Sequence, residues 1–310
     1  MKLVFVMLLV PVCLFAIDPN AGTAGYQFLK INFDARSSSL GEIVSPIWGS
    51  PGSVIANPSA MSFEKKRGVV GNFGLLYAGI NGGSAGIYTP IRDNVRIGSF
   101  LSFISYGDMD KTNENGEKIG TFSAQSIVLG LAVSRPVEND ISVSARLNFI
   151  YDGIDNYNSI GFGLDLSGIV KLSKGRASVG ITARNLGFQL KGFTKEHKDK
   201  LPVLFAAGAS LLPKGLPFRV FTEATKAIDE PFRGKFGLEV IELRPLYLRA
   251  GYTLREKTKS PAFKDEENLN GFSFGAGIEL RESGLFFDYA FSSFGALGST
   301  HKFNLAYNKF

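Results

Sequence analysis

The chain contains few residues that could form a catalytic or metal-binding site. Of its 310 residues only two are histidines, His197 and His301, and one is a cysteine, Cys13. His197 lies in a charged run from Lys195 to Lys200 that is typical of a solvated loop, and His301 begins a candidate strand. So few soft ligands argue against a zinc or iron–sulfur site. We expect no catalytic residue, no metal and no cofactor.

The motifs of common enzymes and binding proteins are also missing. Residues 49–53, with the sequence GSPGS, have the wrong spacing for the nucleophilic serine turn of a hydrolase. No P-loop is present, and the acidic segment 108–113 lacks the sixth-position glycine of a calcium loop. The net charge of +6 is spread without a basic block, which argues against nucleic-acid binding.

The remaining candidates are charged residues that alternate with apolar ones. In residues 141–152, Val143, Leu147 and Phe149 fall on one face and Ser142 and Arg146 on the other, which is the period of a strand. Throughout the chain the charges keep to the more polar face of such segments, whereas the opposite face is nearly free of charge. We expect the following charges to point into a lumen: Arg146, Asp165, Arg184, Glu239, Arg249, Glu279 and Asp288.

Fourteen segments show this pattern and predict an all-β protein. They lie near residues 68–78, 83–91, 95–106, 121–135, 140–152, 159–172, 176–190, 202–212, 217–226, 233–241, 246–255, 271–281, 284–294 and 300–310. Short turns alternate with longer polar loops near 107–120, 153–158, 191–201, 227–232 and 256–270. An even number of strands with this asymmetry is typical of a transmembrane antiparallel β-barrel.

A soluble β-sandwich or propeller can also show alternating strands and glycine-rich turns. Strands of ten or more residues are long for a sandwich but match a tilted membrane crossing. The charge-free faces are suited to lipid, although they could also pair into a soluble core. The pattern favours the transmembrane barrel.

The N-terminus predicts export. Residues 1–16 carry one lysine followed by about a dozen apolar residues, the size of a signal peptide, and cleavage is expected after Ala16. No later run of ~18 apolar residues predicts a membrane-spanning helix. A signal peptide and a barrel together indicate the bacterial outer membrane, with its lipid as a partner.

Several motifs, in order, resemble one known family. They are residues 22–31 (GTAGYQFLKI), 34–42 (DARSSSLGE) and 56–61 (ANPSAM), followed by 183–187 (ARNLG), 249–252 (RAGY) and 287–302. The order and spacing are similar to those of the PorV/PorQ family, which is related to the FadL-type outer-membrane barrels. Ser59 stands where the family signature usually has alanine.

The resemblance implies a barrel of about 14 strands over residues 67–310, with residues 17–66 folded into the lumen as a plug. Phe28, Phe33 and Trp48 would be apolar anchors of the plug or line a ligand pocket. The dipeptide Asn57-Pro58 has the chemistry of a turn. It is either a simple turn leading toward the first strand or part of a gate.

The last candidate strand ends in Phe310. A terminal aromatic residue on an amphipathic strand resembles the signal that the barrel-assembly machinery recognises, although Phe310 breaks the alternation of Phe303, Leu305 and Tyr307. We therefore expect that machinery to be a partner.

The luminal charges carry both signs, which leaves two interpretations. They either pair across strands and hold the plug in a filled lumen, or they line a selective pore. The filled lumen is favoured because a selective pore usually shows one dominant sign.

Three functions remain open, none of them enzymatic. The resemblance implies a role in type IX protein secretion and surface attachment, in which secreted proteins bearing a C-terminal signal domain are partners. A basic rim for such partners would then be formed by the loop residues Lys191, Lys195, Lys198, Lys200, Arg255, Lys257 and Lys259. The alternative is FadL-like passive transport of hydrophobic small molecules. The third is a structural barrel of the cell envelope.

Overall fold

The computed structural model describes residues 20–91, 95–255, 269–280 and 282–308. The expected signal peptide and Phe310 lie outside the described residues, so both remain predictions. No helix in the described part of the chain is long and apolar enough to cross a membrane.

Fourteen strands follow a short N-terminal region of helical turns. The helical elements are η2 (Gln27–Lys30), α1 (Ala35–Ser39), α2 (Ser53–Ala56), η3 (Pro58–Phe63), η4 (Tyr77–Gly79) and η7 (Gly295–Leu297). The strands are β1 (Gly68–Leu75), β2 (Asn81–Pro90), β3 (Arg96–Thr112), β4 (Lys118–Glu138), β5 (Ile141–Ile154), β6 (Tyr157–Leu172), β7 (Ala177–Lys191), β8 (Leu204–Leu211), β9 (Phe218–Ala227), β10 (Arg233–Val240), β11 (Leu246–Thr253), β12 (Phe272–Leu280), β13 (Leu285–Ser293) and β14 (Ser299–Tyr307).

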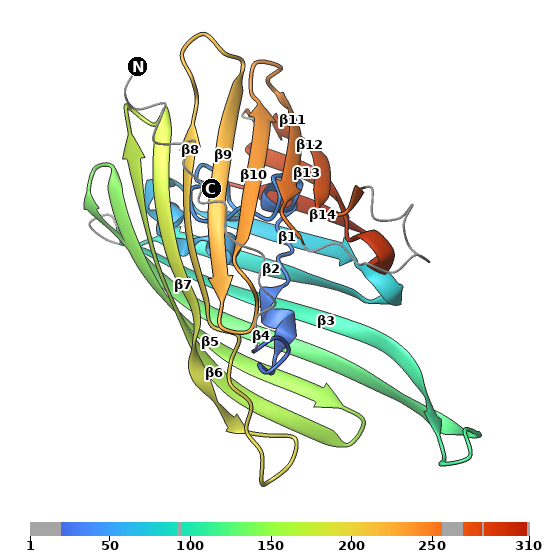
Figure 1. The fold of residues 1–310 in the computed structure, drawn as a ribbon. Helices are drawn as coiled ribbons and strands as arrows, with labels where there is room; N and C mark the ends of the chain where they lie inside the picture. The colour runs from blue at the N-terminus through green and yellow to red at the C-terminus, as the bar shows by residue number, and fades with distance from the viewer. Residues whose placement is uncertain (1–19, 92–94, 256–268, 281, 309–310) are drawn as a thin grey trace.

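The strands form one closed antiparallel barrel (Figure 1). Each strand pairs with its neighbours in the chain, and β1 closes the sheet against β14, where Gly71 lies opposite Leu305. Closure leaves no unpaired edge, which a barrel in lipid requires because no water is there to satisfy the backbone. The predicted all-β barrel of about 14 strands is confirmed.

The two ends of the barrel differ. We call the end that holds the connections 91–95, 139–140, 173–176, 212–217, 241–245 and 281–284 the turn end, and the opposite end the loop end. Strands β3 to β7 have 14 to 21 residues, whereas the other nine have 8 to 10. The five long strands therefore extend well beyond the rest of the wall at the loop end (Figure 1).

The prediction of a long loop over residues 107–120 was wrong. After a register shift at Gly107, β3 continues to Thr112, where Asp110 pairs with Thr121 across to β4. An exposed ion pair of 2.5 Å joins Lys118 to Asp110. Because both faces of this ribbon meet water, its sequence lacks the apolar period that identifies a strand.

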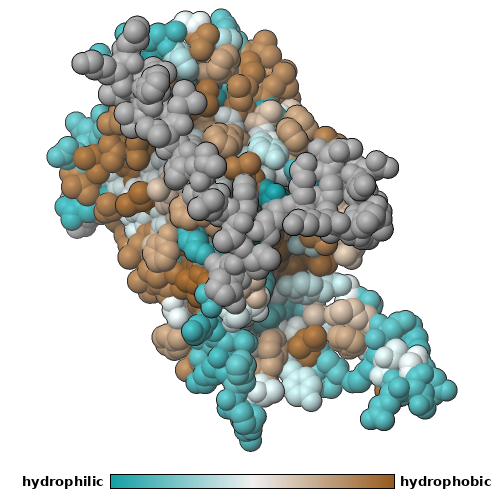
Figure 2. All heavy atoms as spheres, viewed as in Figure 1, coloured by the Kyte–Doolittle hydropathy of each residue, from teal (hydrophilic) through white to brown (hydrophobic). Residues whose placement is uncertain are grey.

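The wall has its apolar side chains outside. Leu147 is 65% exposed, whereas the next residue, Asn148, is 4% exposed and points into the lumen. Figure 2 shows the same division on a larger scale, since hydrophobic residues cover much of the wall and hydrophilic residues gather on the projecting tips. An apolar outer face and a polar interior are the pattern of a membrane barrel rather than of a soluble one.

Candidate functional site

The N-terminal segment fills the lumen. Residues 24–33 pack at the loop end, α1 packs against β11 to β14, and α2 and η3 pack against β2 to β6. We call residues 20–67 the plug, because they lie inside the wall and precede β1.

An apolar cluster anchors one side of the plug. Phe28 and Phe33, two of the residues predicted for the plug, are 8% and 2% exposed and belong to one buried cluster with Phe100, Ile104 and Ile150 of the wall. Fully burying side chains of this size contributes about 1.5–3 kcal/mol each. These wall residues lie on the polar face of their strands, and the sequence analysis did not single them out.

Trp48, the third aromatic residue predicted for the plug, lies elsewhere. It packs edge-on against Phe63 near the turn end, with the ring centroids 6.4 Å apart. The guanidinium of Arg36 donates a hydrogen bond of 3.1 Å to the Trp48 carbonyl. The three predicted aromatic anchors therefore do not form one group.

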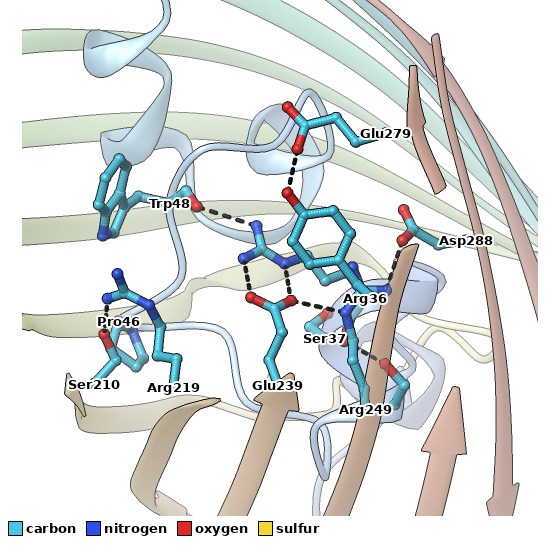
Figure 3. A network of polar contacts seen from close by, with 12 residues as sticks. Arg36, Ser37, Pro46, Trp48, Ser210, Arg219, Glu239, Arg249, Glu279 and Asp288 are labelled. Carbon is cyan, nitrogen blue, oxygen red and sulfur yellow. Dashed lines mark hydrogen bonds and ion pairs between the residues drawn. The ribbon is translucent and has the colours of Figure 1, made fainter. Parts of the chain in front are cut away.

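A four-residue ion-pair network ties the plug to the wall (Figure 3). Arg36 of α1 donates to both carboxylate oxygens of Glu239, at 3.0 and 2.9 Å. Arg249 donates to the same carboxylate at 2.8 Å and to Asp288 at 2.6 Å. Charge-assisted, two-pronged contacts of this kind are among the strongest hydrogen bonds in proteins. Burial alone would lower the pKa of Arg36, but the charge of Glu239 raises it above its ordinary value.

A second network lies between β5, β6 and the plug. Arg146 donates to Asp165 at 2.9 and 2.5 Å and to the backbone carbonyl of Ile55 in α2 at 2.5 Å. Asp165 also accepts from Asn148 and from the backbone of Asn185, at 3.0 and 2.7 Å. A wall arginine thereby satisfies plug carbonyls that would otherwise be buried without a partner.

The other predicted luminal charges are arranged differently. Glu279 accepts a hydrogen bond from Tyr247. Arg184 lines a cavity beside Asp165, and its Nε has no hydrogen-bond partner among the described residues. Of the seven predicted luminal charges, the structure thus places five in the two networks.

The sequence analysis overlooked the charges that the plug itself brings. Besides Arg36, Lys30 donates to Asp229 and Glu230 at 2.8 and 3.0 Å, and Glu42 accepts from Lys302 of β14 at 3.0 Å. Burial alone would raise the pKa of Glu42, but Lys302 lowers it below its ordinary value. The signal was present, since a charge within an otherwise apolar and serine-rich buried segment needs a partner.

Asn57 and Pro58 lie inside the plug. Asn57 is 1% exposed, donates to the Ser45 carbonyl at 2.8 Å, and accepts from the Ser59 backbone and hydroxyl at 3.2 and 2.7 Å. It caps η3, which Pro58 begins. These contacts hold two parts of the plug together. Asn57 and Pro58 are separated along the chain from the first strand, since β1 begins only at Gly68.

Two of the cavities formed by the described residues bear on function. A cavity of about 50 Å³, the central cavity, lies between the plug and β3 to β7 and is lined by Phe28, Phe33, Phe100 and Arg184 among others. A cavity of about 400 Å³, the turn-end cavity, is lined by Trp48, Phe63, Glu64, Arg219, Arg244 and Tyr247 among others.

The two histidines lie at the surface. The Nε2 atom of His197 lies 3.2 Å from a carboxylate oxygen of Asp199 in the 192–203 connection. His301 shares a hydrogen bond of 2.9 Å with the hydroxyl of Tyr289. Neither of these two contacts involves a serine that could act as a nucleophile. Among the described residues, no group of three or more His, Cys, Asp or Glu side chains could hold a metal ion.

Comparison with known proteins identifies the fold. No protein-family model matches the chain, and no curated protein matches it. Among solved structures it is similar to the Pseudomonas putida toluene transporter TodX, with 12% identity and a TM-score of 0.60 over 88% of this chain and 96% of that one. It is also similar to the Ralstonia pickettii toluene transporter TbuX (9%, 0.63, 90% and 98%) and to a Pseudomonas aeruginosa FadL homologue (13%, 0.55, 88% and 97%). At these identities the likeness is one of fold, a 14-stranded barrel with an N-terminal helical segment.

Proposed function

We propose that this chain is an outer-membrane protein that lets small hydrophobic molecules pass across that membrane. The observation that carries the proposal is the apolar contact between plug and wall, where Phe28 and Phe33 meet Phe100 beside the central cavity. Proteins whose names describe transport of toluene share the fold. The apolar outer face and the expected signal peptide support the location.

Transport requires the plug to shift. The central cavity has room for only a few water molecules, so an aromatic hydrocarbon does not fit while Phe28 and Phe33 stay in place. The plug is covalently joined to the barrel only where its last residue meets β1. A hydrophobic ligand that displaced Phe28 or Phe33 would find the same apolar environment that these side chains occupy in the closed state. A ligand that binds the shifted plug more tightly than the closed one stabilises the open state.

The type IX link that the PorV/PorQ resemblance implies is the second candidate. It is favoured by exposed lysines at the loop end, Lys191, Lys195, Lys198 and Lys200, which fit the expected basic rim. Arg255, also expected in the rim, is half-buried with its guanidinium 4.0 Å from the centroid of the Phe294 ring, and Lys257 and Lys259 lie outside the described residues. The apolar cluster inside the lumen has no evident use in this role, and we therefore favour transport.

Uptake of radiolabelled toluene by cells that carry the chain in their outer membrane tests the proposal. We expect faster uptake than in cells with an empty vector, and no faster uptake of a hydrophilic sugar. Under the transport proposal, the double variant Lys195→Glu, Lys198→Glu should leave toluene uptake unchanged. Under the second candidate, it should abolish capture of secreted proteins. Equal toluene uptake with and without the chain would overturn the transport proposal.

A further inference from the structure

The turn-end cavity has the size and lining of a binding site. Its volume of about 400 Å³ lies within the range of small-molecule sites. Figure 3 shows two of its lining residues, Trp48 and Arg219, on one side of the Arg36–Glu239 pair, with Asp288 on the other. The site is distinct from the central cavity, because the two share no lining residue.

Two arginines of this cavity form no ion pair with the residues that the structure describes. Arg36 and Arg249 are neutralised by Glu239 and Asp288. Arg219, in contrast, donates to the Ser210 hydroxyl and the Gly175 carbonyl, at 3.1 and 3.0 Å. Arg244 is exposed and forms no ion pair with any described residue; its guanidinium lies 6.0 Å from the Tyr247 ring. Two guanidiniums therefore keep donors for an anion.

Aromatic rings stand beside these cations. The Arg219 guanidinium lies 5.8 Å from the centroid of Trp48, and the Lys171 ammonium lies 5.4 Å from Trp48 and 3.9 Å from Phe63. Trp48, which packs against Phe63, and Tyr247 thus provide aromatic surface in the cavity lining. A flat molecule can pack against a ring face while its charged end reaches an arginine.

The acidic groups of the cavity lining balance only part of its positive charge. Glu239 and Asp288 are paired with Arg36 and Arg249. Glu279 accepts a hydrogen bond from the neutral Tyr247 hydroxyl and keeps its charge. Glu64 also lines the cavity, and burial raises its pKa to about 7, so that much of it is neutral near neutral pH. Arg219 and Arg244 thus face one charged carboxylate and one that is partly neutral.

We propose that the turn-end cavity binds a small planar organic acid, whose carboxylate is held by Arg219 and Arg244 and whose ring packs against Trp48. Arginine presents a planar fork of donors that matches a carboxylate and also stacks on aromatic faces, so both halves of the site select the same kind of ligand. Binding of the acid at this site does not depend on the transport proposal, since it requires no movement of the plug.

The chain provides its own reporter for this site, because Trp48 is its single tryptophan. Purified protein in detergent is titrated with benzoate while Trp48 fluorescence is recorded, with toluene as the neutral ligand of the same shape and inorganic phosphate as the anion without a ring. We expect a saturable change with benzoate, and at least tenfold weaker responses to toluene and phosphate.

Variants separate a specific site from general attraction. Arg219→Met and Arg244→Met should each raise the Kd for benzoate at least tenfold, whereas Lys214→Met, which removes a charge from the same end outside the cavity, should change it less than twofold. Arg219→Lys keeps the charge and is used if Arg219→Met does not fold; it should also weaken binding, because the fork is lost. Equal affinities for benzoate and toluene, or for benzoate and phosphate, would overturn the proposal, as would an unchanged Kd in both arginine variants.

Discussion

Arg36 of the plug and Glu239 of β10 are joined by two hydrogen bonds of 3.0 and 2.9 Å, and the same carboxylate also accepts from Arg249 of the neighbouring strand at 2.8 Å. Glu239 and Arg249 lie opposite each other in the register of β10 and β11. One wall carboxylate thus holds a cross-strand partner and the plug at once. Within this network, the attachment of Arg36 therefore depends on a single side chain of the wall.

The effect of removing either partner should therefore be unequal. Arg36→Met leaves Glu239 paired with Arg249, so the cost should be that of lost charged hydrogen bonds, about 1.5–3 kcal/mol. Glu239→Gln leaves two buried guanidiniums with only Asp288 between them, and we expect a loss of about 3–5 kcal/mol. Urea unfolding of the purified barrel measures both values.

An exposed ion pair provides the control for this comparison. Lys111→Met removes a 2.6 Å contact with Asp155 in which the side chains are 46% and 29% exposed, and pairs this exposed to solvent contribute little to stability. If Glu239→Gln unfolds at the same urea concentration as Lys111→Met, the network does not hold the plug.

The plug also depends on close backbone contact with the wall at Gly251. A Cβ atom at Gly251 would lie 2.0 Å from the backbone nitrogen of Gly41 and 2.3 Å from the backbone carbonyl carbon of Leu40, so no side-chain rotation relieves the clash. We expect Gly251→Ala to lower the midpoint of unfolding by several degrees, because the plug or β11 must shift. Gly71→Ala is the matched control, since a Cβ there meets nothing within 4 Å. Equal melting temperatures in the two variants would show that the plug does not press on β11.

Stability should fall with rising pH because of Glu64. Burial raises the pKa of this carboxyl from 4.5 to about 7; the charge of Glu279 adds to the rise, and the positive charges of Arg36, Arg96 and Lys171 offset part of it. The folded state therefore holds the proton more tightly than the unfolded state, and the stabilisation present below pH 4.5 is lost as the pH rises through 7. We expect the melting temperature of the native chain to fall from pH 5 to pH 8 by a few degrees more than that of Glu64→Gln. Parallel pH profiles for the two proteins would contradict the raised pKa.

The alternation of residue types predicted the barrel well, because lipid on one side and the lumen on the other impose the same period on every strand. The alternation did not predict the strand beyond Gly107, because both faces of that ribbon meet water and the contrast between lipid and lumen is absent there. It also could not show that Phe100 and Ile150 face a plug rather than water, since both stand on the polar face of their strands. The partner of Arg36 is more than 200 residues away, so no local pattern could identify it.

A reversible tether tests whether the plug must leave the wall for transport. The hydroxyls of Ser62 in η3 and Ser134 in β4 are 2.9 Å apart, close enough for a disulfide in Ser62→Cys, Ser134→Cys. The double variant Ser178→Cys, Ser210→Cys is the matched control, because those hydroxyls are 2.7 Å apart on two neighbouring wall strands. The native chain has no cysteine besides Cys13, which falls in the expected signal peptide. We expect oxidation to reduce toluene uptake at least fivefold in the plug-to-wall variant and to leave the wall-to-wall variant unchanged, with recovery after reduction. Unchanged uptake in the oxidised plug-to-wall variant would mean that ligands pass without displacing η3.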